Sequence, residues 1–402
     1  MYFFGITRFS IFDPSSKAWN LSRADEEKYL ADLYSEDRMT TRVSLFLEKA
    51  LPAYQEMAGK YFYKHILSFS DVMPVKYKKL LLDAARKYPV LHLNKVNDNV
   101  SINRIAESFL ENKESGPIAF FRVDDDDLLS SDYMDLLSRY VREEYNGMAV
   151  SFGSGIAAEY YRSSFRNFRQ CRSRLMTMGL AHIGKYGAQD GRISIPPFFE
   201  HTETDRFIPV IVDSRSQAFL CTMHAGQDTS NGADAHLSRN RLLSRLSSMP
   251  AIQSASQLID KFPAISEDLI RHDSGGDLVA VILEHEIDKN LVEVDVNISL
   301  GAGAYLIRYE IDCDGAEIEP RGLVASFVFN GASAHGVWGL TKSDEQSIGW
   351  YHYIEAGNNH SGTMEFEIFE GVEVNNIKIR PWKKSMADVT IKSLQIFSRY
   401  AY

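Results

Sequence analysis

The feature that most constrains this chain is an apolar segment, residues 117–123, that runs directly into four consecutive aspartates at 124–127. Its aromatic and β-branched side chains suit a pleated, packed surface, so the segment predicts a buried β-strand. Four carboxylates at the end of such a strand repel one another, and a divalent cation facing a polyanionic ligand would balance their charge. The alternative is a solvated acidic loop that caps a helix beginning near Ser131.

Strand-like and helix-like segments alternate through the first 156 residues. Strands are expected at residues 2–9, 64–69, 90–96, 117–123 and 148–156. Apolar residues at helical spacing predict helices at residues 41–57, after Pro74, at 102–109 and after Ser131. Repeated β-α units predict a mostly parallel sheet with helices on both faces, which is an α/β domain of the nucleotide-binding type.

The segment 160–174 is rich in arginine. As a helix, it would place Arg162, Arg166 and Arg169 on one face, where guanidinium groups could bind phosphates through paired hydrogen bonds. A solvated helix face explains the same pattern equally well.

The pattern changes at residues 274–276, after two helices expected at 234–246 and 252–262. Eight short alternating segments follow, bounded by turn residues: 278–283, 291–299, 304–311, 323–329, 347–353, 363–369, 374–379 and 389–396. Such a series predicts an all-β sandwich or jelly roll. The chain should therefore hold an α/β domain at residues 1–270 and a β-sandwich domain at residues 276–402.

The predicted sandwich carries several large aromatic residues. Trp338, Trp350, Tyr351 and Trp382 could form a stacking platform for sugar rings. Packing in the core is the favoured explanation for any one of them, because sandwich cores are built from such side chains.

Composition excludes some classes of function. The net charge of −10 over 402 residues argues against a general nucleic-acid-binding protein, which needs a basic surface. Three cysteines far apart in the sequence do not form a disulfide framework, so reduced thiols and a cytoplasmic location are expected. No segment approaches the roughly 18 apolar residues of a membrane span. A peripheral association with the inner face of a membrane stays open.

Polar residues gather where the predicted parallel strands end. Thr7 and Arg8 end the first strand, Ser70 and Asp71 end the second, and the aspartates at 124–127 end the fourth. Parallel strands share one carboxyl edge, so these groups should line a single crevice. A pocket for a base and ribose beside a metal–pyrophosphate site is what a nucleotide sugar needs.

These residues resemble a known family. Residues 7–9, the helix that ends at 51–52, the strand at 65–71 and the motif at 122–127 look like those of the bacterial putative rhamnosyltransferase family, whose members are GT-A-type glycosyltransferases. The family pattern of arginine, an aliphatic residue, Asp-x-Asp and Asp is met by Arg122, Val123, Asp124, Asp126 and Asp127.

The resemblance covers roughly residues 1–235 and includes two histidines. The aromatic-aliphatic stretch 219–226 places His224 on the histidine of the family's His-Gly, and His201 matches another histidine more loosely. Gln227-Asp228 departs from the asparagine expected after the His-Gly.

The resemblance implies roles for the acidic motif. Asp124 would lie near the ribose and the metal, and Asp126, expected at an exposed strand end, would coordinate Mn²⁺ or Mg²⁺ directly. The metal would bridge the donor diphosphate and stabilise the leaving group. His224 could add an imidazole ligand, which suits Mn²⁺, or have a structural role. Asp127 and His201, with the three arginines named above, are candidates for phosphate or acceptor contacts.

An inverting enzyme also needs a carboxylate that deprotonates the acceptor hydroxyl. Glu200 is the first candidate and Asp190 the second, because both lie downstream of the acidic motif.

Together these features predict a metal-dependent glycosyltransferase. It would move a sugar, rhamnose if the family holds, from a nucleotide-diphosphate donor to a glycan or lipid-linked acceptor in bacterial surface polysaccharide synthesis, and its sandwich would hold the glycan or mediate assembly. One alternative is a non-catalytic glycan-binding protein on a degenerate glycosyltransferase scaffold. Another is a nucleotidyltransferase, against which stands the lack of a Gly-rich basic loop after the first strand.

Overall fold

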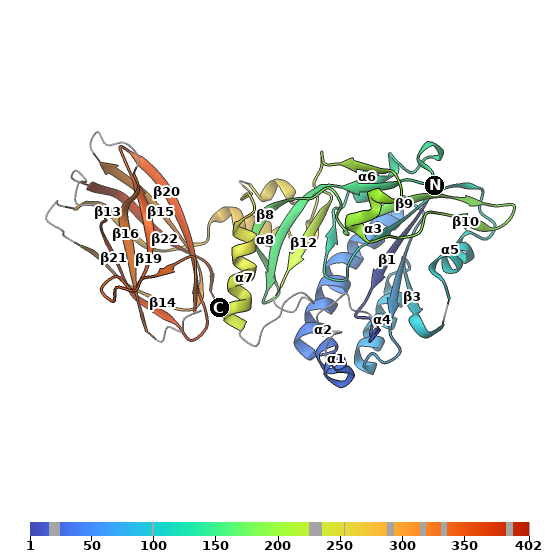
Figure 1. Cartoon of the computed structure of the whole chain (residues 1–402), viewed down its shortest axis with the longest axis horizontal. Coiled ribbons are helices and arrows are strands. Elements are labelled where there is room, and N and C mark those ends of the chain that lie inside the picture. Colours follow the sequence, from blue (N-terminus) through green and yellow to red (C-terminus); the bar gives the residue numbers. More distant parts are fainter. Residues whose placement is uncertain are drawn as a thin grey trace. The chain divides into compact units, whose positions relative to one another are not determined.

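The computed structural model describes residues 1–15, 25–98, 100–224, 235–252, 254–287, 293–313, 319–330, 336–382 and 389–401. The chain divides into two compact units. The first consists of residues 1–231 and 245–270, and the second of residues 232–244 and 271–402. Figure 1 shows a mixed α/β unit and a unit built mainly of β-strands.

An eight-stranded sheet forms the centre of the first unit, in the order β11-β6-β9-β4-β1-β2-β3 with β10 beside β9. Strands β4, β1, β2 and β3 are parallel, and β9 runs antiparallel between β4 and β6. The mainly parallel α/β sheet expected from the sequence is confirmed. Its strands are β1 (Tyr2–Arg8), β2 (Tyr63–Phe69), β3 (Leu91–Lys95), β4 (Gly116–Arg122), β6 (Ala149–Phe152), β9 (Leu180–Gly187), β10 (Arg192–Ser194) and β11 (Val210–Asp213).

Helices cover both faces of this sheet. Phe4, Ile66 and Phe120 share one face and pack with α5 in a single hydrophobic cluster. On the other face, Phe121 contacts Tyr133 of α6, with ring centroids 5.0 Å apart. The helices of this unit are α1 (Glu26–Leu33), α2 (Glu36–Val43), the π-helix Ser44–Ala50, α3 (Leu51–Lys60), α4 (Val75–Lys87), α5 (Ile102–Leu110) and α6 (Tyr133–Ser138). Among the described residues, no helix is both long and apolar enough to cross a membrane.

The arginine-rich segment corrects the sequence interpretation. It belongs to a hairpin of β7 (Ser154–Tyr161) and β8 (Ser164–Arg172), in a small sheet with β5 (Leu128–Leu129) and β12 (Phe219–Met223). Arg162 lies at the hairpin turn with a φ of 49°, while Arg166 and Arg169 are buried in β8. The Arg166 Nε–H donates to the buried Glu159 carboxylate at 2.9 Å. Helical spacing could not reveal Glu159 as the partner of Arg166, because the two residues meet only when β7 and β8 pair in the hairpin.

The segment between the α/β sheets and the sandwich also differs from expectation, and most of its first helix belongs to the second unit. The helix predicted at residues 234–246 is α7 (Ala235–Ser247). The helix predicted at 252–262 is absent from the described residues. In its place the chain has the 3₁₀ turns Ser256–Leu258 and Pro263–Ile265, and α8 (Ser266–Ser274) begins after them.

The second unit contains two five-stranded antiparallel sheets, in the orders β13-β22-β15-β20-β17 and β14-β21-β16-β19-β18. Alternate side chains of both sheets fill one hydrophobic core, so the predicted β-sandwich is confirmed. Each predicted strand has a counterpart, and two short strands were missed, β17 (Val337–Trp338) and β18 (Thr341–Lys342). The others are β13 (Asp277–Ile287), β14 (Val294–Leu300), β15 (Gly303–Cys313), β16 (Glu319–Asn330), β19 (Trp350–Ala356), β20 (His360–Ile368), β21 (Glu373–Pro381) and β22 (Val389–Ala401).

A buried chain of hydrogen bonds joins β2, β1 and the residue that follows β4. The Thr7 hydroxyl donates to the Val123 carbonyl at 2.8 Å, so it accepts from His65 Nε2–H at 2.9 Å. The other ring nitrogen, Nδ1, then accepts from the Tyr63 hydroxyl at 2.7 Å. Burial lowers the pKa of His65 to about 3, which keeps the ring neutral, as this arrangement requires.

Gly5 leaves room for this chain of hydrogen bonds. A Cβ atom at position 5 would lie 2.5 Å from His65 Nδ1 and 2.7 Å from the Tyr63 hydroxyl. We expect Gly5→Ala to lower the free energy of unfolding by about 1–3 kcal/mol, as overpacking does. Gly59→Ala is the matched control, since nothing lies within 4 Å of its Cβ position in α3 and the change should stabilise the helix. Urea denaturation of both variants measures the difference; equal effects would contradict this account.

Candidate functional site

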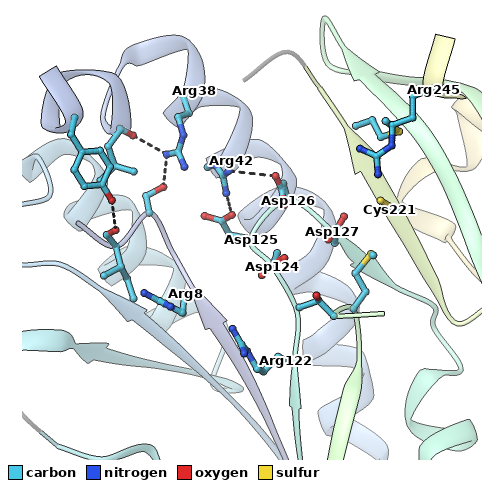
Figure 2. Close-up of a pocket in the computed structure, with 17 residues that line it drawn as sticks. Arg8, Arg38, Arg42, Arg122, Asp124, Asp125, Asp126, Asp127, Cys221 and Arg245 are labelled. Atoms are coloured by element: carbon cyan, nitrogen blue, oxygen red, sulfur yellow. Dashed lines mark hydrogen bonds and ion pairs between the residues drawn. The ribbon is translucent and has the colours of Figure 1, made fainter. Parts of the chain in front are cut away.

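A pocket of about 400 Å³ lies where β1 and β4 end, at the carboxyl edge of the parallel strands. Figure 2 shows the four aspartates and several arginines around it. Five guanidinium groups line the pocket, those of Arg8, Arg38, Arg42, Arg122 and Arg245. A pocket lined by both anionic and strongly cationic groups suits a ligand that brings a metal cation and a phosphate together.

Arg42 of α2 neutralises part of the acidic cluster. Its guanidinium forms ion pairs with Asp125 and, at 3.5 Å, with Asp126. The three residues are 6%, 1% and 6% exposed, so the interaction is shielded from water. The sequence interpretation of Asp126 as an exposed strand end is therefore wrong. Removing either partner would leave an uncompensated buried charge.

His224 contacts the same carboxylate from the end of β12. Its Nε2 lies 3.1 Å from Asp126 Oδ2. Burial alone would raise the pKa of Asp126, but the positive charge of Arg42 and the hydrogen bond from His224 outweigh it and hold this pKa below its ordinary value. Asp126 is therefore ionised at neutral pH. The neighbouring Ala225, Gly226 and Gln227-Asp228 lie outside the described residues.

The other two aspartates carry charge that their surroundings do not fully balance. Asp127 accepts a hydrogen bond from the Thr222 amide at 2.8 Å, yet burial and the negative charges of Asp126 and Asp124 raise its pKa well above the usual range. The Asp124 carboxyl is open to water in the pocket, but desolvation by the surrounding protein and the charge of Asp126 raise its pKa.

The chemistry of these groups fits a divalent cation, although no three His, Cys, Asp or Glu side chains among the described residues already form a metal-binding group. Two ligands at right angles, each about 2.1 Å from one ion, lie roughly 3 Å apart. Asp126 Oδ2 and His224 Nε2, now 3.1 Å apart in a hydrogen bond, have that separation, so an ion that replaced the Nε2 proton could contact both. A cation here would also relieve the excess negative charge that raises the pKa values of Asp124 and Asp127.

Arg8 and Arg122 face the pocket from the ends of β1 and β4 (Figure 2). Burial and the nearby positive charge of Arg122 lower the pKa of Arg8. Asp13 offsets only part of this effect, since its carboxylate is 3.9 Å from the Arg8 guanidinium. An anion between the two arginines would relieve their repulsion.

The other predicted donor contacts do not line this pocket. Thr7 is fully buried in the hydrogen-bond chain described above. The Ser70 hydroxyl accepts from the Phe12 amide at 2.8 Å, and Asp71 is an exposed residue whose carbonyl contacts Lys78. Thr7 and Ser70 therefore position the strand ends and their loop.

The two predicted catalytic bases lie at opposite ends of the strands, Asp190 at the amino end of β4 and Glu200 toward its carboxyl end. In the antiparallel pairing of β9 with β4, Tyr186 lies opposite Gly116, so Asp190 follows β9 at the amino end of β4. Asp190 is thus far from the pocket. The chain then returns toward the carboxyl end of β4, where the centroid of the Phe198 ring lies 5.9 Å from the Arg122 guanidinium. Glu200 follows two residues later and pairs with His201 Nδ1 at 2.8 Å.

Sequence reasoning missed Arg38, Arg42 and Arg245. Arg38 donates to the Ser10 hydroxyl at 2.9 Å and to the Leu33 carbonyl at 2.8 Å, which holds α2 beside the pocket. A signal existed, because Arg38, Met39 and Arg42 lie on one helical face, and two arginines beside a methionine on a buried face need carboxylate partners. For Arg245, only the tertiary structure brings the residue to the pocket.

The aspartates should respond oppositely to neutralisation in metal-free protein. The pKa of Asp126 is lowered by folding, so its ionisation stabilises the fold above the ordinary pKa and this contribution is lost as the pH falls. Asp126→Asn should therefore cost about 3 kcal/mol at pH 7. The pKa of Asp127 is raised, so stability falls as the pH rises above about 4. Asp127→Asn should gain on the order of 1 kcal/mol at pH 7.

Denaturation of both variants between pH 3 and 7, with a chelator present, measures these effects. The difference for Asp127→Asn should vanish near pH 3, whereas that for Asp126→Asn should only begin to shrink below about pH 4 and should largely persist at pH 3. A loss of stability in Asp127→Asn at pH 7 would contradict the assignment of excess charge to that residue.

Comparison with known proteins places the chain in a family. No curated protein sequence matches it. Among solved structures it is similar to residues 1–349 of TarS from S. aureus, with 14% identity over 68% of this chain and 72% of that chain. The TM-score of 0.24 is too low to support any conclusion. The family model described as "Putative rhamnosyl transferase" matches residues 2–235, which is more than half of the sequence. The chain belongs to this family of glycosyltransferases.

Proposed function

We propose that this protein is a metal-dependent glycosyltransferase that moves a sugar from a nucleotide-diphosphate donor to a glycan or lipid-linked acceptor. The family description makes rhamnose the first sugar to test. The observation that carries the proposal is the pocket at the carboxyl edge of β1 and β4, where arginines and aspartates meet. We further propose that it acts in the cytoplasm, at the inner face of the membrane, in bacterial surface polysaccharide synthesis.

Arg8 and Arg122 would bind the donor diphosphate. Their guanidinium groups lie at neighbouring strand ends, and each offers the forked donors that match phosphate oxygens. Because burial and the charge of Arg122 lower the pKa of Arg8, a bound dianion between the two residues would be held by both and would stabilise both charges. Their placement beside Asp124 puts the phosphates next to the acidic cluster.

Asp126 and His224 would hold Mn²⁺ or Mg²⁺, and Asp124 would face both the ion and the ribose. A bound divalent ion would neutralise the negative charge that develops on the departing diphosphate. Arg42 fixes the Asp126 side chain and keeps it ionised, so Asp126 could bind the ion without first losing a proton.

Glu200 would accept the proton of the acceptor hydroxyl. It is largely exposed, lies on the Arg122 side of the sheet and is oriented by His201. An exposed glutamate can reach an acceptor hydroxyl, and its contact with the imidazole of His201 would fix its orientation for general-base catalysis. Asp190 is not proposed, because it lies at the amino end of β4.

Mixing the purified protein with Mn²⁺ and a panel of nucleotide sugars, then measuring nucleoside diphosphate release, tests the proposal. Thermal shifts with UDP, GDP, dTDP and CMP identify the base, since a ligand that binds the native state raises the melting temperature. Metal-dependent release is expected with one donor. Glycan binding without any release or thermal shift would favour a non-catalytic glycan-binding protein.

Arg8→Gln should weaken nucleoside diphosphate binding roughly 10- to 100-fold, because it removes charge-assisted hydrogen bonds to phosphate. Arg86→Gln is the matched control: Arg86 is 78% exposed on α4 and pairs only locally with Asp83 at 3.0 Å among the contacts described here. Titration calorimetry with Mn²⁺ measures both affinities. Equal affinities in the two variants would exclude Arg8 from the donor site.

Glu200→Gln should lower turnover roughly 10²- to 10⁴-fold while nucleoside diphosphate affinity is kept, because the substitution removes only the proton acceptor. Rates at saturating donor and acceptor, with the same calorimetric titration as control, measure this. If turnover is unchanged, another group is the base.

A further inference from the structure

Three aromatic rings lie together on the outer face of the sandwich sheet that contains β19. Ile354 and Ala356 of this strand are in the core, so Tyr351 and Tyr353 point to the other face. The centroids of these two rings are 5.1 Å apart, and the Trp382 ring lies 5.3 Å from Tyr353. We call these three side chains the aromatic platform.

The platform differs from the set of aromatics singled out in the sequence. Trp350 packs against the core, and Trp338 is in β17 of the other sheet. Tyr353 takes part instead, with the Arg321 guanidinium 5.0 Å from its ring centroid. Trp382 remains 40% exposed, so the outer end of the platform is accessible to a ligand.

Polar atoms beside the platform have unused hydrogen-bonding capacity. Ser326 of β16 lies directly opposite Tyr351 and is 4% exposed, and its hydroxyl has no hydrogen-bond partner among the described residues. Asn376 of β21 donates from its amide nitrogen to Asp295 at 3.2 Å, while its Oδ1 has no partner within the same described part of the chain. Asn376 lies farther along the face, opposite Val328. Ser326 is therefore the group next to the platform, where a hydroxyl of a ligand stacked on the rings would satisfy its buried oxygen.

The two basic residues of β21 on this face already have acidic partners. Lys378 lies 3.0 Å from Glu293 and 3.7 Å from Asp295, and Arg380 lies 3.2 Å from Glu293. The face therefore offers ring surfaces and neutral hydrogen-bonding groups, with the basic residues of β21 neutralised and Arg321 against the Tyr353 ring. A polysaccharide matches this combination, because one side of a sugar ring is apolar and its rim carries hydroxyls.

We propose that the aromatic platform and Ser326 form a second glycan-binding site, for a neutral, hydroxyl-rich polysaccharide. The inference rests on the proposed function, in which such a glycan is the acceptor or product. The site lies within the second unit, so it would hold the polymer by contacts separate from those that bind the donor.

Native gels that contain a soluble rhamnose polysaccharide test the proposal on the full chain, with dextran gels for comparison. The wild-type protein should be retarded by the rhamnose polysaccharide. Tyr353→Ala and Trp382→Ala should each weaken the affinity roughly tenfold, as expected for loss of a stacking contact. Phe397→Ala is the control, since this ring lies on the other sheet beneath Arg308 at 4.9 Å, and it should bind like the wild-type protein.

Ser326→Ala separates a binding role from a structural one. Loss of an unpartnered buried hydroxyl should leave the melting temperature unchanged or raise it. Binding to the polysaccharide should nevertheless fall several-fold. Unchanged retardation in this variant, together with unchanged retardation in both aromatic variants, would overturn the proposal.

Two other outcomes would also overturn it. One is that neither the rhamnose polysaccharide nor dextran retards the wild-type protein. The other is a change of oligomeric state in Tyr353→Ala and Trp382→Ala, measured by light scattering, while no form of the protein binds polysaccharide. That result would assign the face to self-association. Nucleoside diphosphate binding by the wild-type protein is measured separately. Its absence, with polysaccharide binding kept, would count against the proposed function and not against this site.

Discussion

The ion pairs of Arg42 with Asp125 and Asp126 are the interaction on which the rest of the site depends. Two neighbouring carboxylates buried at the end of β4 would repel each other and lose their hydration, a cost of several kcal/mol per ion. The guanidinium from α2 offsets this cost and fixes the helix against the strand end. Arg38, one turn earlier, anchors the same helix to the loop after β1. The walls of the pocket are thus held by charge as much as by apolar packing.

That balance is incomplete, and the imbalance is what makes the site suited to a ligand. Asp124 and Asp127 have raised pKa values because burial removes water from their carboxyl groups and because the negative charge of the neighbouring aspartates is not fully offset by the described cations. Arg8 shows the opposite imbalance a short distance away, with its pKa lowered beside Arg122. A metal ion and a diphosphate, bound together, would correct both. Functional sites commonly retain such local instability, which the surrounding fold must tolerate.

The hydrogen-bond chain from Tyr63 to Val123 shows how the fold tolerates it. The neutral His65 ring lies between two hydroxyl groups, and its last partner is the carbonyl just before the acidic run. The strand end is therefore held by uncharged, buried groups that do not line the pocket. In the sandwich, by contrast, the Ser326 hydroxyl is buried without a partner among the described residues, and the exposed part of the aromatic platform is Trp382.

Side-chain periodicity in the sequence predicted the parallel strands β1 to β4, the eight longer strands of the sandwich and the carboxyl edge that carries Asp124 and Arg122, because such periodicity is a local property. The tertiary structure decided which distant groups meet. The arginine-rich segment became a hairpin because Arg166 finds Glu159 across it, and the antiparallel β9 moved Asp190 to the amino end of β4. Arg42 reached the aspartates from 83 residues away in the sequence. Pairing over such separations depends on the folded chain as a whole, and no local pattern encodes it.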